Sequence, residues 1–161
     1  MNLALFLQNV LYRMLFYAPI LVISITVHEY AHARTAQALG DPTAAQQGRV
    51  SLNPLRHLDP VGSVLMLLFG FGWGKPVPVA ALNFKKPKRD MALTALAGPL
   101  SNFILAFLSL AVFKLLTLAP FMNSSFFAAE WIATFLSTFA LLNIGLGVFN
   151  LIPIPPLDGS K

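Results

Sequence analysis

Three long apolar segments dominate the chain, at residues 3–39, 91–119 and 130–150. Hydrophobic types make up 57% of the 161 residues and charged types 11%, against roughly 25% charged residues in soluble domains. A soluble fold of this size cannot bury so much apolar surface, because surface falls slowly relative to volume as chains shorten. We therefore expect an all-α, multi-pass membrane protein, with about three spanning helices in a single membrane-embedded domain over residues 1–161.

The first apolar segment is too long for one straight span. At about 1.5 Å per residue it exceeds the ~30 Å hydrocarbon core, and Pro19 interrupts it. We expect an interfacial or tilted start, a kink or break at Ala18-Pro19, and a spanning helix that ends near Leu39.

The region between the first two spans contains shorter elements. Residues 61–74 are apolar but short, which favours a re-entrant or interfacial segment. Residues 75–82 are expected to be extended, as one arm of a short β-hairpin-like segment, and prolines restrict them to an edge. Asp90 is a predicted N-cap for the helix from about Met91 to Ala119. The last span is expected to run from about Glu130 to Asn150.

Basic residues indicate the orientation of the helices. Eight of the eleven lie between Arg34 and Arg89, so the positive-inside rule places that stretch in the cytoplasm. The end of the first span and the residues after Asn150 then lie on the same side. The cluster Lys85–Arg89 is better explained as a topology determinant that touches anionic lipid than as a nucleic-acid site. We expect the lipid bilayer among the partners, and no nucleic acid.

The pattern His28-Glu29-Tyr30-Ala31-His32 lies within the first apolar segment. Residues four apart share one face of a helix, so both imidazoles reach toward one point and suit Zn²⁺. Glu29 lies one step round the helix, where it can act as a general base toward a water whose pKa the metal lowers to about 7. Ordinary hydrogen bonding is the alternative, but ionisable groups inside a membrane helix are costly and usually mark a function.

A tetrahedral site with one water needs a third protein ligand, and the chain has no cysteine. His57 and a carboxylate are the choices. We favour Asp158, because it follows the returning span on the membrane face to which His28 and His32 point, although it could instead cap a following helix. The remaining acids are in turn, cap or opposite-side positions: Asp41, Asp59, Asp90 and Glu130.

Two motifs together resemble the site-2 protease family of intramembrane zinc metalloproteases, in its short prokaryotic form. They are His28-Glu29-x-x-His32 and Asn150-x-x-Pro153-x-x-x-Leu157-Asp158-Gly159, with Ala97–Asn102 between them. The resemblance implies one Zn²⁺ per chain held by His28, His32 and Asp158, with Glu29 as the catalytic base. Asn150 would bind the substrate backbone or stabilise the oxyanion.

The same resemblance implies cleavage within or next to a transmembrane segment of another membrane protein. The site would lie toward the cytoplasmic side of a bacterial or archaeal plasma membrane. The sequence ends three residues after Asp158, where members of the family usually continue. We therefore expect it to be truncated before a further C-terminal helix.

Several residues keep two interpretations. His57 is either a loop histidine bonded to nearby backbone or an auxiliary group that stabilises the tetrahedral intermediate. Residues 70–81 either line the substrate path, with an edge for strand addition, or form a membrane-dipping loop. The glycines at 98, 145 and 147 are expected to allow close helix packing.

Two further functions share some of these features. A non-catalytic zinc-binding scaffold or transporter component would also hold a metal, but the ionisable residues gather at one end of the spans and Glu29 is present. A metalloprotease that acts on lipidated C-terminal peptides would share the first motif and lack the residues around Asp158.

Overall fold

The computed structural model describes residues 2–69, 72–118, 127–155 and 157–160. Its α-helices are α1 (Leu3–Tyr12), α2 (Ala18–Ala38), α3 (Thr43–Gln46), α4 (Pro60–Phe69), α5 (Pro87–Leu116) and α6 (Phe127–Asn150). The short helical turns are η1 (Arg13–Tyr17), η2 (Pro54–Arg56), η3 (Ala81–Asn83) and η5 (Asp158–Ser160). Gly70, Phe71 and the predicted helix end at Ala119 lie outside the described residues, as does Pro156.

In the described part of the chain, three helical stretches are long and apolar enough to cross a membrane: Leu3–Ala38, Pro87–Thr117 and Ala129–Asn150. Large apolar side chains point outward from them, and Leu15, Phe107 and Leu141 are each 70% exposed. The hydrocarbon core of a bilayer around these helices would remove this apolar surface from water. The described residues therefore confirm the expectation of three helices long and apolar enough to span a membrane.

The first stretch is interrupted where the sequence predicts a break. The π-helical turn η1 ends at Tyr17, and Pro19 occupies the first turn of α2. Proline has no N–H to continue the α-helical pattern, so a widened turn before it accommodates the missing bond. Helix α2 then ends at Ala38, and Gly40 follows with a φ of 110°, which glycine adopts at low cost.

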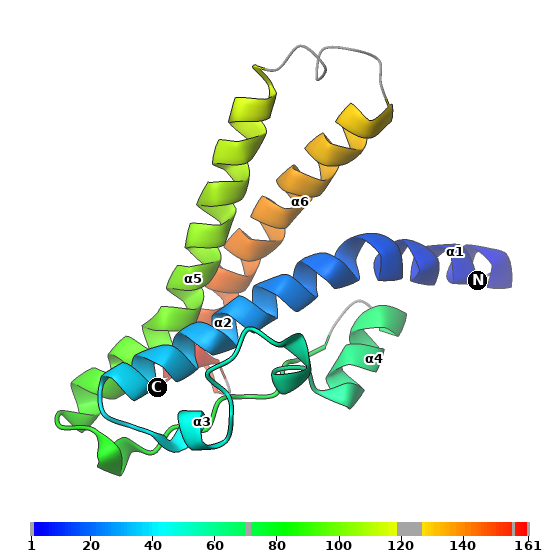
Figure 1. Ribbon diagram of the computed structural model, residues 1–161. Coiled ribbons are helices and arrows are strands. Elements are labelled where there is room, and N and C mark those ends of the chain that lie inside the picture. The colour runs from blue at the N-terminus through cyan, green and yellow to red at the C-terminus, as the bar shows by residue number, and fades with distance from the viewer. Residues whose placement is uncertain (1, 70–71, 119–126, 156, 161) are drawn as a thin grey trace.

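Helices α5 and α6 run side by side as an antiparallel pair, and α2 packs across α5 near the end where α6 finishes (Figure 1). A Cβ atom added at Gly147 would lie 2.8 Å from the ring of Phe103, so the missing side chain lets α6 approach α5. The packing prediction holds for Gly147. It is wrong for Gly145, where an added Cβ meets nothing within 4 Å.

The start of α5 differs from the prediction. The helix begins at Pro87 rather than near Met91, because proline is well suited to a first helical position. Asp90 is therefore not the N-cap. It lies buried in the first turn, and its Oδ2 accepts a hydrogen bond from the backbone N–H of Lys86 at 3.0 Å.

Residues 75–80, here called the covering segment, connect Gly74 to η3 and form neither helix nor strand. The N–H of Lys75 donates to the carbonyl of His57 at 2.7 Å, and Arg49 donates to the carbonyl of Lys75. At the other end, the N–H of Ala80 donates to Asp41 Oδ2 at 2.8 Å. These bonds hold the covering segment against residues 41–57, which lie between α2 and α4.

The described residues contain no strand, so the expected β-hairpin is not formed in full. Its only trace among them is a single antiparallel β-bridge between Leu58 and Gly74. The apolar residues after Pro60 form the ten-residue helix α4, and Asp59 caps it by accepting from the N–H of Gly62 at 2.8 Å. The cap interpretation of Asp59 is confirmed.

Candidate metal centre

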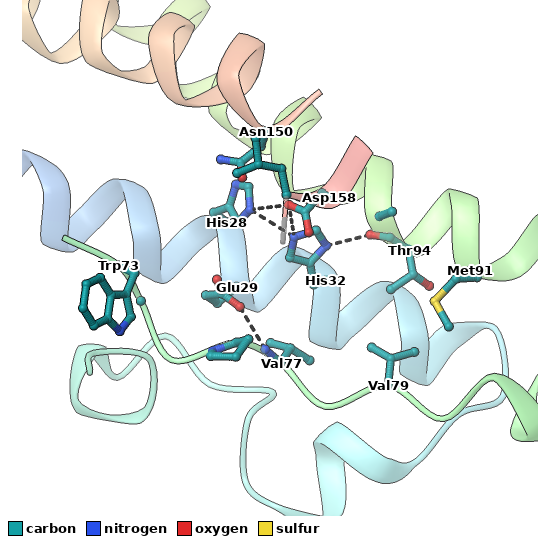
Figure 2. Close-up of a pocket in the computed structure, with 14 residues that line it drawn as sticks. His28, Glu29, His32, Trp73, Val77, Val79, Met91, Thr94, Asn150 and Asp158 are labelled. Atoms are coloured by element: carbon teal, nitrogen blue, oxygen red, sulfur yellow. Dashed lines mark hydrogen bonds and ion pairs between the residues drawn. The ribbon is translucent and has the colours of Figure 1, made fainter. Parts of the chain in front are cut away.

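Two histidines from α2 and one aspartate from η5 meet in the interior. The Nε2 atoms of His28 and His32 lie 3.0 Å apart. Asp158 Oδ2 lies 3.0 Å from the first and 2.9 Å from the second. All three residues are buried, and Figure 2 shows their side chains converging between α2, α5 and the end of the chain.

The second nitrogen of each imidazole is engaged elsewhere. His32 Nδ1 lies 2.7 Å from the backbone carbonyl oxygen of Thr94, and His28 Nδ1 lies 2.6 Å from Asn102 Oδ1. A carbonyl oxygen only accepts hydrogen bonds, so each Nδ1 carries the proton and donates it. Each neutral imidazole then presents the lone pair of its Nε2 to the shared centre.

This donor set fits a zinc ion. In these tautomers three lone-pair atoms converge with no proton between the two Nε2 atoms, an arrangement that a cation stabilises. Two imidazoles and a carboxylate are ligands of catalytic zinc sites and leave a fourth position free. Tetrahedral ligands about 2.0–2.1 Å from zinc lie about 3.3 Å apart, so the spacing of 2.9–3.0 Å between these atoms needs only a small expansion.

Gly98 on α5 lies against both imidazoles. A Cβ atom there would be 2.4 Å from His32 Nε2 and 2.6 Å from His28 Nε2. The sequence predicts a packing role for this glycine, and the structure shows that the packing occurs at the candidate centre itself.

The centre opens into a cavity of about 670 Å³. Its polar lining comes mainly from the residues that the sequence singles out: His28, Glu29, His32, Asn150 and Asp158. Its apolar wall includes Trp73, Val77, Val79, Met91 and Leu157. A largely apolar cavity with a few convergent polar groups is typical of a ligand site.

Glu29 lies between the three candidate ligands and the covering segment (Figure 2). Its Oε2 accepts a hydrogen bond from the N–H of Val77 at 3.2 Å. Arg49 is close enough to interact with Glu29: burial lowers the pKa of the Arg49 guanidinium, the carboxylate of Glu29 raises it, and the net pKa lies below its ordinary value. The covering segment thus contacts Glu29 directly.

Asn150 and His57 have different positions. Asn150 ends α6 and lines the cavity, with its Nδ2 donating to the carbonyl of Leu146 at 2.9 Å. His57 is fully buried outside the lining, with its Nε2 2.6 Å from the carbonyl oxygen of Ser51. For His57 the structure therefore shows the local backbone contact.

Thr94 and Asn102 contact the imidazoles, and the sequence alone did not predict these contacts. Asn102 lies in the segment Ala97–Asn102 that carries part of the family resemblance. It is also a polar residue within a spanning helix, which is a general signal of function. The bond from His32 to a backbone carbonyl has no such signal.

Known proteins resemble this chain along most of its length. Residues 118–161 match the sequence profile of peptidase family M50. YwhC of Bacillus subtilis (strain 168), named as a candidate zinc metalloprotease, is 47% identical over 143 residues, covering 88% of this chain and 64% of that protein. Rip2 of Mycobacterium tuberculosis (strain H37Rv), named in the same way, is 36% identical over 142 residues, covering 86% of this chain and 52% of that protein.

A more distant relative is the zinc metalloprotease MJ0392 of Methanocaldococcus jannaschii, 29% identical over 143 residues, which are 88% of this chain and 31% of that protein. The chain thus spans 64% or less of the length of these three relatives. No solved structure matches it. The two motifs, the shared centre and these relatives agree: the chain is similar to peptidase family M50, the family of the site-2 proteases.

Proposed function

We propose that this chain forms the catalytic core of an intramembrane zinc metalloprotease. It would hydrolyse peptide bonds within or next to transmembrane segments of other membrane proteins, in regulated intramembrane proteolysis. The observation that carries the proposal is the meeting of His28, His32 and Asp158 with Glu29 in one cavity among apolar helices. A transporter or scaffold would need the metal ligands, but not a carboxylate beside them.

The geometry supports a role for each of these residues. A zinc ion held by His28, His32 and Asp158 would supply a Lewis acid that acidifies water and polarises a peptide carbonyl. Glu29 takes the proton of the attacking water as the new C–O bond forms, and returns it to the nitrogen as the C–N bond breaks. The amide of Asn150 would leave the carbonyl of Leu146 and donate to the oxygen on which negative charge develops.

The covering segment is suited to hold an unwound substrate. Val77 and Val79 line the cavity, and the N–H of Val77 donates to Glu29, which also lines it. Pro76 precedes Val77 and Pro78 lies between the two valines, and neither proline has an N–H to donate. An extended peptide can therefore pair along the edge formed by Val77 and Val79, as in strand addition.

The charge distribution supports a cytoplasmic opening of the cavity. Eight of the eleven basic residues lie between Arg34 and Arg89, and the covering segment that lines the cavity belongs to this stretch. Since basic loops are retained on the cytoplasmic side, the cavity would open to the cytoplasm of a bacterial or archaeal plasma membrane, where water is supplied.

Cleavage by the purified protein tests the proposal. The full chain in detergent, loaded with one equivalent of zinc, is mixed with peptides that contain a transmembrane segment, and the product ends are read by mass spectrometry. We expect cleavage that stops on addition of a zinc chelator and returns with zinc. Tight zinc binding without cleavage of any membrane peptide, in this chain and in a form extended to the length of its relatives, would favour the scaffold instead.

A further inference from the structure

Four polar side chains from three helices form a continuous buried chain that ends at His28. They are Ser24 and His28 on α2, Asn102 on α5 and Asn143 on α6. Ser24, Asn102 and Asn143 are each 0% exposed. Buried amides and hydroxyls inside a membrane bundle are costly unless they are bonded to one another.

The direction of this hydrogen-bond chain is set at its far end by backbone carbonyls. Ser24 Oγ donates to the carbonyl of Ile20 at 2.7 Å. Asn143 Nδ2 donates to the carbonyl of Phe139 at 2.9 Å and to Ser24 Oγ at 2.8 Å. Because these carbonyls only accept and the Ser24 proton is used, the amide of Asn143 has one satisfied orientation.

The orientation of Asn143 in turn fixes the orientation of the Asn102 amide, which contacts His28. Asn143 Oδ1 faces Asn102 and accepts from its Nδ2 at 2.8 Å. Asn102 Oδ1 is thereby turned toward His28 Nδ1, 2.6 Å away. Reversing the Asn102 amide would set its oxygen against that of Asn143 and its NH₂ group against His28. Only the Nδ1–H form of His28 satisfies every member.

His32 needs no such arrangement. Its Nδ1 faces the backbone carbonyl of Thr94, which α5 holds in place. His28 faces a side-chain amide, which by itself could present either an oxygen or an NH₂ group. The two histidines therefore use different means to reach the same tautomer.

We propose that Asn102 and Asn143 are positioning residues, which fix His28 in the tautomer that leaves its Nε2 lone pair free for zinc. This rests on the proposed zinc site, and Ser24 is the terminal member of the chain. Outer partners of metal-binding histidines contribute about 10- to 100-fold to metal affinity. A break at Asn143, which bonds to no proposed ligand, should therefore weaken zinc binding at a distance.

Zinc affinity of the purified full chain, measured by competition with a chromogenic chelator, tests this directly. We expect binding about 10-fold weaker in Asn143→Leu and up to about 100-fold weaker in Asn102→Leu. Ser109→Ala is the matched control, because the buried Ser109 also donates from α5 to α6, to the carbonyl of Leu136 at 2.8 Å, but does not belong to the hydrogen-bond chain. Equal affinity in Asn143→Leu and the control would overturn the proposal.

A measurement on the unmodified protein covers the case in which the leucine variants fail to fold. Nitrogen-15 NMR of labelled histidine in the zinc-free chain distinguishes the two tautomers. We expect a proton of His28 on Nδ1, and the neutral form with its only proton on Nε2 would overturn the proposal. Failure of the zinc site itself would appear separately, as a wild-type chain that binds no zinc while His28 keeps the Nδ1–H form.

Discussion

Gly98 on α5 lies so close to His32 on α2 that a methyl group at Gly98 would be 2.4 Å from His32 Nε2. Nonbonded carbon and nitrogen atoms do not approach this closely, so a side chain there must push the helix or the imidazole away. We predict that Gly98→Ala loses most bound zinc, as measured by metal analysis of the purified protein. Gly145→Ala is the control, because nothing lies within 4 Å of its added Cβ. Full zinc content in Gly98→Ala would show that the imidazoles are not held where the structure has them.

Glu29→Gln separates metal binding from catalysis. The glutamine oxygen can still accept from the N–H of Val77, so we expect zinc content to be retained. Without a base, cleavage of a co-expressed membrane substrate should fall by about 10²- to 10⁴-fold. Glu130→Gln, at the exposed start of α6, should leave both quantities unchanged. Sustained cleavage in Glu29→Gln would rule out the assignment of Glu29 as the base.

Asp158→Asn tests the third ligand. Replacing one carboxylate oxygen by an NH₂ group weakens one metal bond and leaves the side-chain volume nearly the same, so we expect zinc to be lost to a chelator at lower concentration. Asp59→Asn, which changes only the cap of α4, is the control. Unchanged zinc retention in Asp158→Asn would indicate a different third ligand.

His57 is tested by two substitutions that differ in one hydrogen bond. In His57→Gln the side-chain amide can still donate to the carbonyl of Ser51, so we expect the covering segment and the cleavage rate to be preserved. In His57→Ala that bond and the buried volume are lost, and the rate should fall with zinc content unchanged. Equal losses in both variants would show that the imidazole itself takes part in the reaction.

The buried carboxylate of Asp41 makes attachment of the covering segment dependent on pH. Burial raises the pKa of Asp41, but hydrogen bonds from Thr43, Asn83 and the N–H of Ala80 lower it by more, so the pKa lies below its ordinary value. A lowered folded-state pKa stabilises the attached form above the unfolded value of about 3.9 and loses that effect as the pH falls through the folded value.

We therefore expect hydrogen exchange at residues 75–83, corrected for its intrinsic pH dependence, to stay slow from neutral pH to about pH 4 and to accelerate below it. Asp41→Asn should accelerate this hydrogen exchange at neutral pH by on the order of tenfold, because the donors of Thr43, Asn83 and Ala80 then face a neutral amide instead of a carboxylate. Asp59→Asn should not. A rate in Asp41→Asn equal to that of the wild type would contradict this role of Asp41.

Short-range geometry explains what could be predicted from the sequence. The three spans follow from the length of the apolar segments, and the break in the first follows from Pro19. His28 and His32 share a face because residues four apart do so in any α-helix. The predicted start of α5 near Met91 is wrong, because Asp90 is a residue type typical of an N-cap and only the backbone shows that the helix begins at Pro87.

Long-range packing decides the rest. Asp158 is 126 residues from His32, and the sequence pointed to it by exclusion and by family resemblance rather than by any local rule. The closeness of Gly98 to the imidazoles, and the hydrogen-bond chain through Asn102 and Asn143, depend on how α2, α5 and α6 cross. The sequence by itself determined a membrane protein with a pair of histidines on one helix face, placed where they could bind a metal. Only the tertiary structure decided which polar groups face those histidines, because helix periodicity specifies a face of each helix but not the helix that packs against it.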